Sequence, residues 1–167
     1  EGACHLTVDG AGKVVLAANY TSGSIAVFPV LGDGSLGEST QTLRHHGSSV
    51  NAERQEAPHP HSINLDPTDR FAYSPDLGAD KIYIYSLDSA AATLRLAQTP
   101  WVRASAPGSG PRHFAFHPGG EFAYVINELA STITAYDLDH ATGALSEIET
   151  VSTLPDGFGE TNYTADL

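Results

Sequence analysis

Hydrophobic and polar positions alternate in short runs along the chain, and these runs return in a fixed order. An alternating run over residues 61–65 ends in a proline turn and is followed by runs at 71–74, 81–85 and 94–98. Runs rich in β-branched and aromatic residues, separated by Gly, Asp and Pro, predict antiparallel strands. The same order recurs twice more, at 6–8, 14–17, 24–28 and 36–43, and at 114–116, 122–125, 132–136 and 145–151. No stretch predicts a helix.

One motif marks the start of each set of runs. It reads Cys4-His5-Leu6-Thr7-Val8-Asp9, then His61-Ser62-Ile63-Asn64-Leu65-Asp66-Pro67, then Arg112-His113-Phe114-Ala115-Phe116-His117-Pro118. Ten residues after Asp9, Asp66 and His117 stands a polar residue: Asn19, Asp76 and Asn127. Four strands in about 45 residues, repeated, are typical of a β-propeller blade. A β-sandwich is the alternative, but it gives no reason for the motif to recur.

The predicted fold is therefore all-β, with about three consecutive four-stranded antiparallel blades. Their approximate bounds are 3–43, 60–103 and 111–153, and residues 154–167 lead into a further blade. Propellers close with about four to eight blades, so three cannot form a ring. We expect a piece of a larger propeller; the alternative is a short chain that closes by self-association. An open wedge exposes strand faces and sheet edges, which predicts pairing or aggregation.

The composition excludes several classes of partner. The net charge is −12 with only eight Lys and Arg, which argues against a nucleic-acid partner because phosphate contacts need clustered basic residues. The single cysteine, Cys4, excludes an internal disulfide and is predicted to be a small packed thiol. No apolar run approaches the length needed to span a membrane, so no membrane partner is expected. The predicted location is the cytoplasm.

Candidate chemistry gathers where the first two strands of each blade meet. The first strand lines the central channel and the second runs antiparallel to it, so the residue that opens one lies beside the residue that closes the other. The predicted neighbours are Cys4 with Asn19–Tyr20, His61 with Asp76–Leu77, and Arg112 with Asn127–Glu128. These positions are polar and differ between repeats, which packing alone does not explain.

Arg112 and Glu128 are the strongest candidates. Arg112 follows a glycine-rich turn and offers a planar fork for a carboxylate or phosphate. Glu128 is a candidate general acid or base. A simple ion pair between Arg112 and Glu128 is the structural alternative, and the two interpretations are compatible.

The histidines allow two interpretations. His59 and His61 are spaced to project to one side of an extended chain and, with Asp76 or Asp80, could bind a metal. No third ligand of fixed spacing is evident, so we predict no metal and a histidine hydrogen-bonded at a turn. His45 and His46, in the variable connection 44–58, are predicted to be solvated.

These residues resemble the bacterial lactonase family of seven-bladed propellers, which includes 6-phosphogluconolactonases and fungal carboxymuconate-cyclising enzymes. The resemblance rests on Ala18-Asn19-Tyr20-Thr21-Ser22-Gly23-Ser24, Arg54-Gln55-Glu56, His59-Pro60-His61, Asp76-Leu77-Gly78-Ala79-Asp80, Gly110-Pro111-Arg112-His113, His117-Pro118, Asn127-Glu128 and Thr153-Leu154-Pro155. It implies a site without metal or other cofactor that binds a small anionic lactone or its open-chain acid.

By the same resemblance, His61, Arg112 and Glu128 are the expected catalytic residues, joined by an arginine from a later blade. We predict substrate contacts from His59, Asp76, His113 and Asn19. The leading hypothesis is hydrolysis of 6-phosphogluconolactone to 6-phosphogluconate, in the pentose phosphate route. The alternatives are cyclisation of 3-carboxy-cis,cis-muconate to a lactone and a non-enzymatic propeller that binds a partner through its loops.

Overall fold

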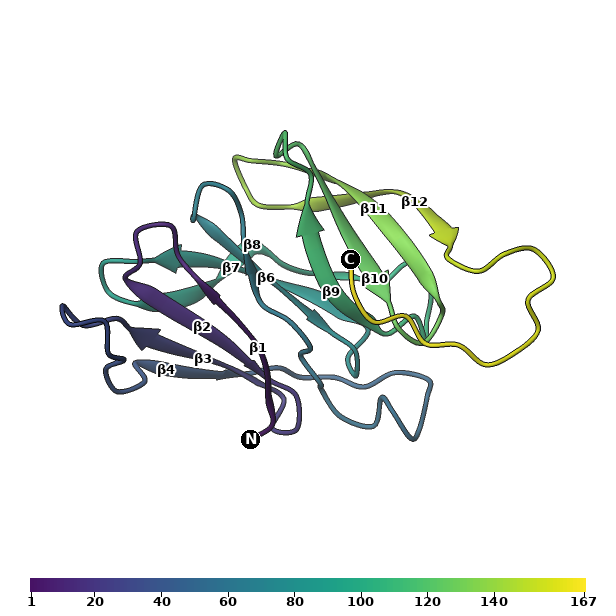
Figure 1. Cartoon of the computed structure of the whole chain (residues 1–167), viewed down its shortest axis with the longest axis horizontal. Coiled ribbons are helices and arrows are strands. Elements are labelled where there is room, and N and C mark those ends of the chain that lie inside the picture. The colour runs from purple at the N-terminus through teal and green to yellow at the C-terminus, as the bar shows by residue number, and fades with distance from the viewer.

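The computed structural model describes residues 1–167 and confirms the all-β prediction, with three four-stranded antiparallel sheets in chain order (Figure 1). The first sheet contains β1 (Ala3–Val8), β2 (Val14–Asn19), β3 (Ser24–Pro29) and β4 (Gln41–Arg44). The second contains β5 (Asn64–Leu65), β6 (Phe71–Asp76), β7 (Lys81–Asp88) and β8 (Thr93–Arg103). The third contains β9 (Pro111–Phe116), β10 (Phe122–Asn127), β11 (Thr132–Leu138) and β12 (Leu145–Ser152). Each sheet is one blade of a partial β-propeller.

Three predicted strands differ clearly from the observed ones, and one of them, β8, continues to Arg103 instead of ending at residue 98. β4 begins at Gln41 rather than at residue 36, because Val30 and Leu36 form an isolated bridge that closes a glycine-containing loop. β5 is reduced to two residues instead of the predicted 61–65. There Ser62 leaves the strand ladder: its hydroxyl donates to the Arg112 carbonyl at 2.9 Å, in the third blade.

The same turn joins the first two strands of every blade. Asp9 Oδ1 accepts from two backbone N–H groups four and five residues later, at 2.6 and 2.8 Å, and Asp66 Oδ1 does the same at 2.8 and 2.7 Å. In the third blade His117 Nδ1 accepts from the Gly119 N–H at 3.0 Å. A side-chain acceptor that caps its own turn explains why the sequence motif ends in these residues.

The core lies between the blades as two apolar clusters. One joins the first and second sheets through side chains such as Leu16, Ile25 and Leu94, and the other joins the second and third through Tyr73, Ile84 and Val125. Burying a large apolar side chain stabilises the fold by about 1.5–3 kcal/mol. Stacking of sheets face to face through such clusters holds the blades together as a wedge.

The chain has no helix long and apolar enough to cross a membrane. In Figure 1 the segment after β12 loops out and returns across the third blade, so the C-terminus lies in front of β9. This return carries residues 162–166 toward the ends of β9 and β10, where the candidate chemistry lies.

Candidate active site

The predicted neighbours meet at one end of the blades, which we call the site end. Ala3 pairs with Asn19, with Cys4 in a bulge beside it, and Pro111 pairs with Asn127. In the second blade Pro60 bridges Asp76, and the His61 N–H donates to the Pro75 carbonyl at 3.0 Å. The predicted adjacency of first-strand and second-strand residues is confirmed in all three blades.

Two arginines bind the Glu128 carboxylate from different segments. Arg112 Nε donates to Oε2 at 3.0 Å from within the same blade, and an Arg54 Nη donates to Oε1 at 2.6 Å from the connection 44–58. The ion pair between Arg112 and Glu128 predicted from the sequence is therefore present. The terminal nitrogens of Arg112 have no hydrogen-bond partner within the chain, so its guanidinium can still bind an anion.

Arg54 gives this cluster a net positive charge. Glu128 is buried, and the hydrogen bond that Arg54 donates to it, with a further contribution from the nearby Tyr20 side chain, raises the pKa of the Arg54 guanidinium above its already high value. Two guanidinium groups therefore share one carboxylate. A net positive spot in a chain of net charge −12 concentrates small anions.

Three histidine rings line the first strands beside these arginines. The His61 and His113 rings lie 5.3 Å apart, and the His5 and His113 rings lie 5.5 Å apart. Burial, followed by the positive charge of Arg112, lowers the pKa of His61 to about 4, and burial and His113 also lower the pKa of His5. His61 is thus neutral at pH 7, and its buried Nδ1 has no hydrogen-bond partner within the chain. A neutral imidazole can accept a proton.

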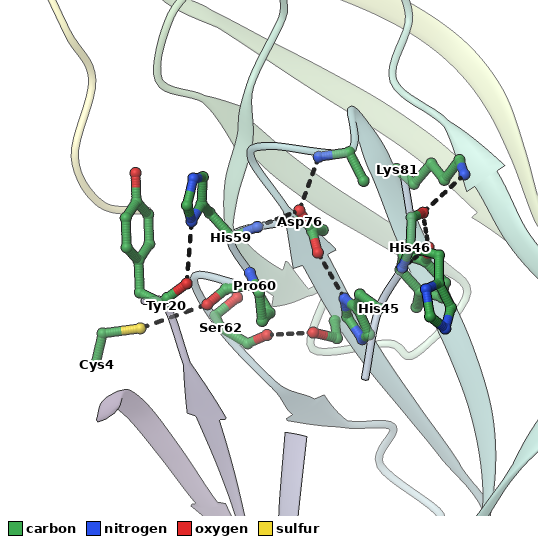
Figure 2. A network of polar contacts seen from close by, with 12 residues as sticks. Cys4, Tyr20, His45, His46, His59, Pro60, Ser62, Asp76 and Lys81 are labelled. Carbon is green, nitrogen blue, oxygen red and sulfur yellow. Dashed lines mark hydrogen bonds and ion pairs between the residues drawn. The ribbon is translucent and has the colours of Figure 1, made fainter. Parts of the chain in front are cut away.

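His59 is held against Tyr20 rather than beside His61. Its ring stacks on the Tyr20 ring at 4.5 Å, and its Nδ1 lies 3.0 Å from the Tyr20 carbonyl oxygen, as Figure 2 shows. Its Nε2 lies 3.1 Å from Glu56. His59 and His61 therefore do not converge on one point, and no group of three or more His, Cys, Asp or Glu side chains is arranged to hold a metal.

Asp76 lies in the interior, which contradicts its prediction as a substrate contact. It is fully buried, and its carboxylate accepts from the N–H groups of His59 at 2.7 Å and Ala79 at 2.8 Å, while His45 Nδ1 lies 2.6 Å away (Figure 2). His45 is also buried, and its ring stacks on Tyr83 at 3.8 Å. The prediction of a solvated His45 is wrong, because Asp76 gives its ring a partner inside the protein; His46 is exposed as predicted.

The end of the chain supplies a residue that the sequence did not single out. Asp166 Oδ1 lies 2.6 Å from His113 Nδ1, and the Thr164 hydroxyl donates to the Asn127 carbonyl at 2.9 Å. Tyr163 lies 5.8 Å below the Arg54 guanidinium, in cation–π contact. The hydrogen bond that the His113 ring donates to Asp166, followed by the Leu167 N–H and the charge of His113, lowers the pKa of the Asp166 carboxyl. These residues cross the site end of the third blade.

Two further predicted neighbours, Asn19 and Cys4, do not belong to the cluster around Glu128. Asn19 donates to the Ser24 hydroxyl at 3.4 Å within its own hairpin and makes no contact with Arg112 or Glu128. Cys4 is exposed rather than packed, although its thiol donates to the His61 carbonyl at 3.3 Å. The structure thus brings together His61, Arg112, His113 and Glu128, adds Arg54, Tyr20 and Asp166, and leaves Asn19 apart.

Known proteins resemble this chain over most of its length. The chain is 41% identical over 155 residues to a protein of Bacillus subtilis named 6-phosphogluconolactonase, covering 93% of this chain and 43% of the relative. It is 36% identical over 163 residues to the protein of that name from Pectobacterium carotovorum, covering 98% of this chain and 45% of the relative. The chain thus spans less than half the length of these curated relatives.

Solved structures show the same likeness. The crystal structure of a putative 6-phosphogluconolactonase from Bacteroides fragilis matches with a TM-score of 0.85 and 35% identity, over 92% of this chain and 44% of that one. The Pseudomonas aeruginosa periplasmic gluconolactonase PpgL matches with a TM-score of 0.87 and 34% identity, over 95% and 44%. The family described as lactonase, 7-bladed β-propeller, matches residues 1–167, and the chain belongs to that family.

Proposed function

We propose that this chain forms three blades, with part of the active site, of a seven-bladed lactone hydrolase that acts on a small anionic sugar lactone. The proposed substrate is 6-phosphogluconolactone and the product is 6-phosphogluconate. The observation that carries the proposal is the cluster in which Arg54 and Arg112 share Glu128 beside a neutral His61. The names of the relatives support the same reaction class.

Arg112 binds the substrate anion in the proposed mechanism. Its Nε is held by Glu128 at 3.0 Å, which fixes the plane of the guanidinium and leaves its terminal nitrogens for a phosphate or carboxylate. Glu128, bound by two arginines, orients both of them. His113 flanks the site and can add a hydrogen bond to the bound anion, whereas both ring nitrogens of His59 are already paired, with Tyr20 and with Glu56.

His61 is the proposed general base. It takes a proton from water, the resulting hydroxide attacks the lactone carbonyl carbon, and the ring C–O bond breaks when the tetrahedral intermediate collapses. The proton then passes from His61 to the departing ring oxygen, which gives the open-chain acid. General-base assistance contributes about 10²–10⁴ to the rate, and cationic donors near the oxyanion contribute a few kcal/mol each.

The test is hydrolysis of fresh 6-phosphogluconolactone above its spontaneous rate. It compares this chain, the complete ring that contains it, and the Arg112→Ala variant of that ring. Arg95→Ala is the matched control, because Arg95 is an exposed arginine on β8 that forms no ion pair. We expect the ring to be active, Arg112→Ala to lose at least about 100-fold in kcat/KM, and Arg95→Ala to retain activity.

A ring without activity on this substrate would overturn the substrate assignment. Equal losses in the two arginine variants would overturn the role of Arg112. The cytoplasm remains the proposed location, and fractionation of cells that express the full-length protein tests it against the periplasm, where the Pseudomonas aeruginosa relative is named as residing.

A further inference from the structure

We propose that the loop Asp76–Asp80, between β6 and β7, positions the anion-binding side chains of the site through two buried carboxylates, those of Asp76 and Asp80. Both are positioning residues, since their contacts are with the protein and not with the space beside Arg112. The inference rests on the proposed function for its activity measurement.

Asp80 holds the segment that leads into Arg112. Its carboxylate accepts from the backbone N–H groups of Gly108 at 2.5 Å and Gly110 at 2.8 Å, and from the Ser49 hydroxyl at 2.5 Å. Asp80 is buried and forms no ion pair, so these donors are the groups that compensate for its burial. One carboxylate therefore ties the connection 104–110 to the connection 44–58, immediately before Arg112.

The first half of the loop holds the segment that carries Arg54 and His59. Asp76 accepts from the His59 N–H, and His45 lies on the other oxygen. Beside it, the fully buried Gln55 donates from its amide to the Leu77 carbonyl at 2.8 Å. The residue next to Arg54 is thus fixed to the same loop.

Gly78 shows how closely the loop and this segment approach each other. A Cβ added at Gly78 would lie 1.8 Å from the Ala57 carbonyl oxygen and 2.9 Å from the His59 ring. Only a glycine permits this approach, and its φ is not in the left-handed region, so the requirement is one of space. Because the loop packs this closely against Ala57 and the His59 ring, we expect a shift of the loop to displace His59.

Comparison of the repeats shows that the carboxylates are special to the second blade. At the place of Asp76 the other blades have Asn19 and Asn127, whose amides donate within their own hairpins. At the place of Asp80 they have Gly23 and Ser131, which share its left-handed backbone, with φ of 61° and 52° against 52°. The fold therefore accepts neutral residues at both positions, and closure of the hairpin does not require the two charges.

The test compares Asp80→Asn with Asp69→Asn in the complete ring. Asp69 is a matched control: it also has a left-handed backbone, with φ of 56°, and it also accepts a glycine N–H from another segment, that of Gly10 at 2.7 Å. It lies before β6, at the opposite end of the strand. Asparagine tolerates this conformation, so both variants keep the turn and lose only a carboxylate.

We expect Asp80→Asn to raise KM for 6-phosphogluconolactone and the calorimetric Kd for 6-phosphogluconate by roughly 10- to 100-fold, with a smaller fall in kcat. Asp69→Asn should change neither by more than about twofold. Hydrogen exchange supplies a readout that is independent of activity: the amides of residues 104–112 should exchange faster in Asp80→Asn and not in Asp69→Asn.

If Asp80→Asn does not fold, Ser49→Ala removes a single donor from the same carboxylate and should give smaller changes of the same sign. Unchanged Kd, KM and exchange in a folded Asp80→Asn ring, or Ser49→Ala ring in its place, would overturn the positioning role. A wild-type ring that neither hydrolyses the lactone nor binds the acid would overturn the proposed function alone, because the exchange comparison then still decides the role of Asp80.

Discussion

The two ends of the blades use polar side chains in different ways. At the turn end, where β1 meets β2 and β5 meets β6, the Asp9 and Asp66 carboxylates bond to N–H groups four or five residues away. At the site end, several bonds join residues that are far apart in the chain: Gln55 and Leu77 are 22 positions apart, and Arg54 and Glu128 are 74 positions apart.

This difference follows from the structural role of each end. Every blade needs the same chain reversal, so the turn end repeats the same local solution. At the site end the pairing of the strands is already fixed, and side chains there can differ between blades without loss of the fold. The polar residues that recur in every blade therefore form the turns of the fold, and the polar residues that differ between blades form the proposed active site.

The largest expected effect that tests this comparison is on catalysis. His61→Ala in the complete ring should lower kcat/KM for 6-phosphogluconolactone by about 10²–10⁴, because it removes the proposed base. His140→Ala, an exposed histidine in the β11–β12 connection, should leave kcat/KM unchanged. Steady-state kinetics corrected for spontaneous hydrolysis measure both, and retained activity in His61→Ala would refute its role.

The pH dependence of kcat/KM should show how far the surroundings of His61 lower the pKa of its imidazole. Because burial and Arg112 lower the pKa of His61 to about 4, its neutral form persists as the pH falls through 6.5. We expect kcat/KM to stay level between pH 8 and about 5 and to fall to half near pH 4, with circular dichroism as the control for unfolding. An acid limb near 6.5 would show that an unshifted histidine is the base.

Gly78→Ala should have the largest effect on stability. The added methyl group would overlap the Ala57 carbonyl, so we expect a loss of about 3 kcal/mol in the free energy of unfolding. Gly32→Ala is the control, because a Cβ there meets nothing within 4 Å and the backbone φ is not left-handed. Urea unfolding measures both; equal midpoints would mean that the close approach at Gly78 is not required.

A smaller loss of stability is expected at the turn end. Asp66→Ala removes the acceptor for the Arg70 and Phe71 N–H groups and should cost about 1–2 kcal/mol. Its kcat/KM per folded molecule should match the wild type, since Asp66 lies away from Arg112. A fall in kcat/KM without a fall in stability would contradict the proposed separation of a structural turn end from a catalytic site end.

Self-association of the isolated chain should be the effect that depends least on single residues. Leu6 and Val8 on β1 are 62% and 48% exposed, and Ile148 and Val151 on β12 are also exposed. Apolar side chains on open strands favour pairing. Light scattering should give a mass above the 17.6 kDa of one chain, and a single species of that mass would contradict the prediction.

The sequence predicted most of the fold and the adjacency of the residues at the centre of the proposed site. The periodic runs located all three blades, because alternation and turn residues are local signals. The repeat alignment placed His61, Arg112 and Glu128 at strand ends that the structure shows together. It failed at the start of the second blade, where β5 contains only Asn64 and Leu65 and the preceding Ser62 side chain bonds to the third blade.

Only the tertiary structure decided the roles of His45, Arg54, Asp76 and Asp166. Each acquires its partner from a segment 31 to 74 residues away, and the residue type alone gives no sign of that partner. Asp76 is a carboxylate of the kind that contacts substrates, but it is fully buried and serves the structure instead. The sequence by itself determined the repeating blades through local alternation and turn chemistry. Burial and long-range hydrogen bonds, which exist only after the blades stack, determined which polar residues remain free to act.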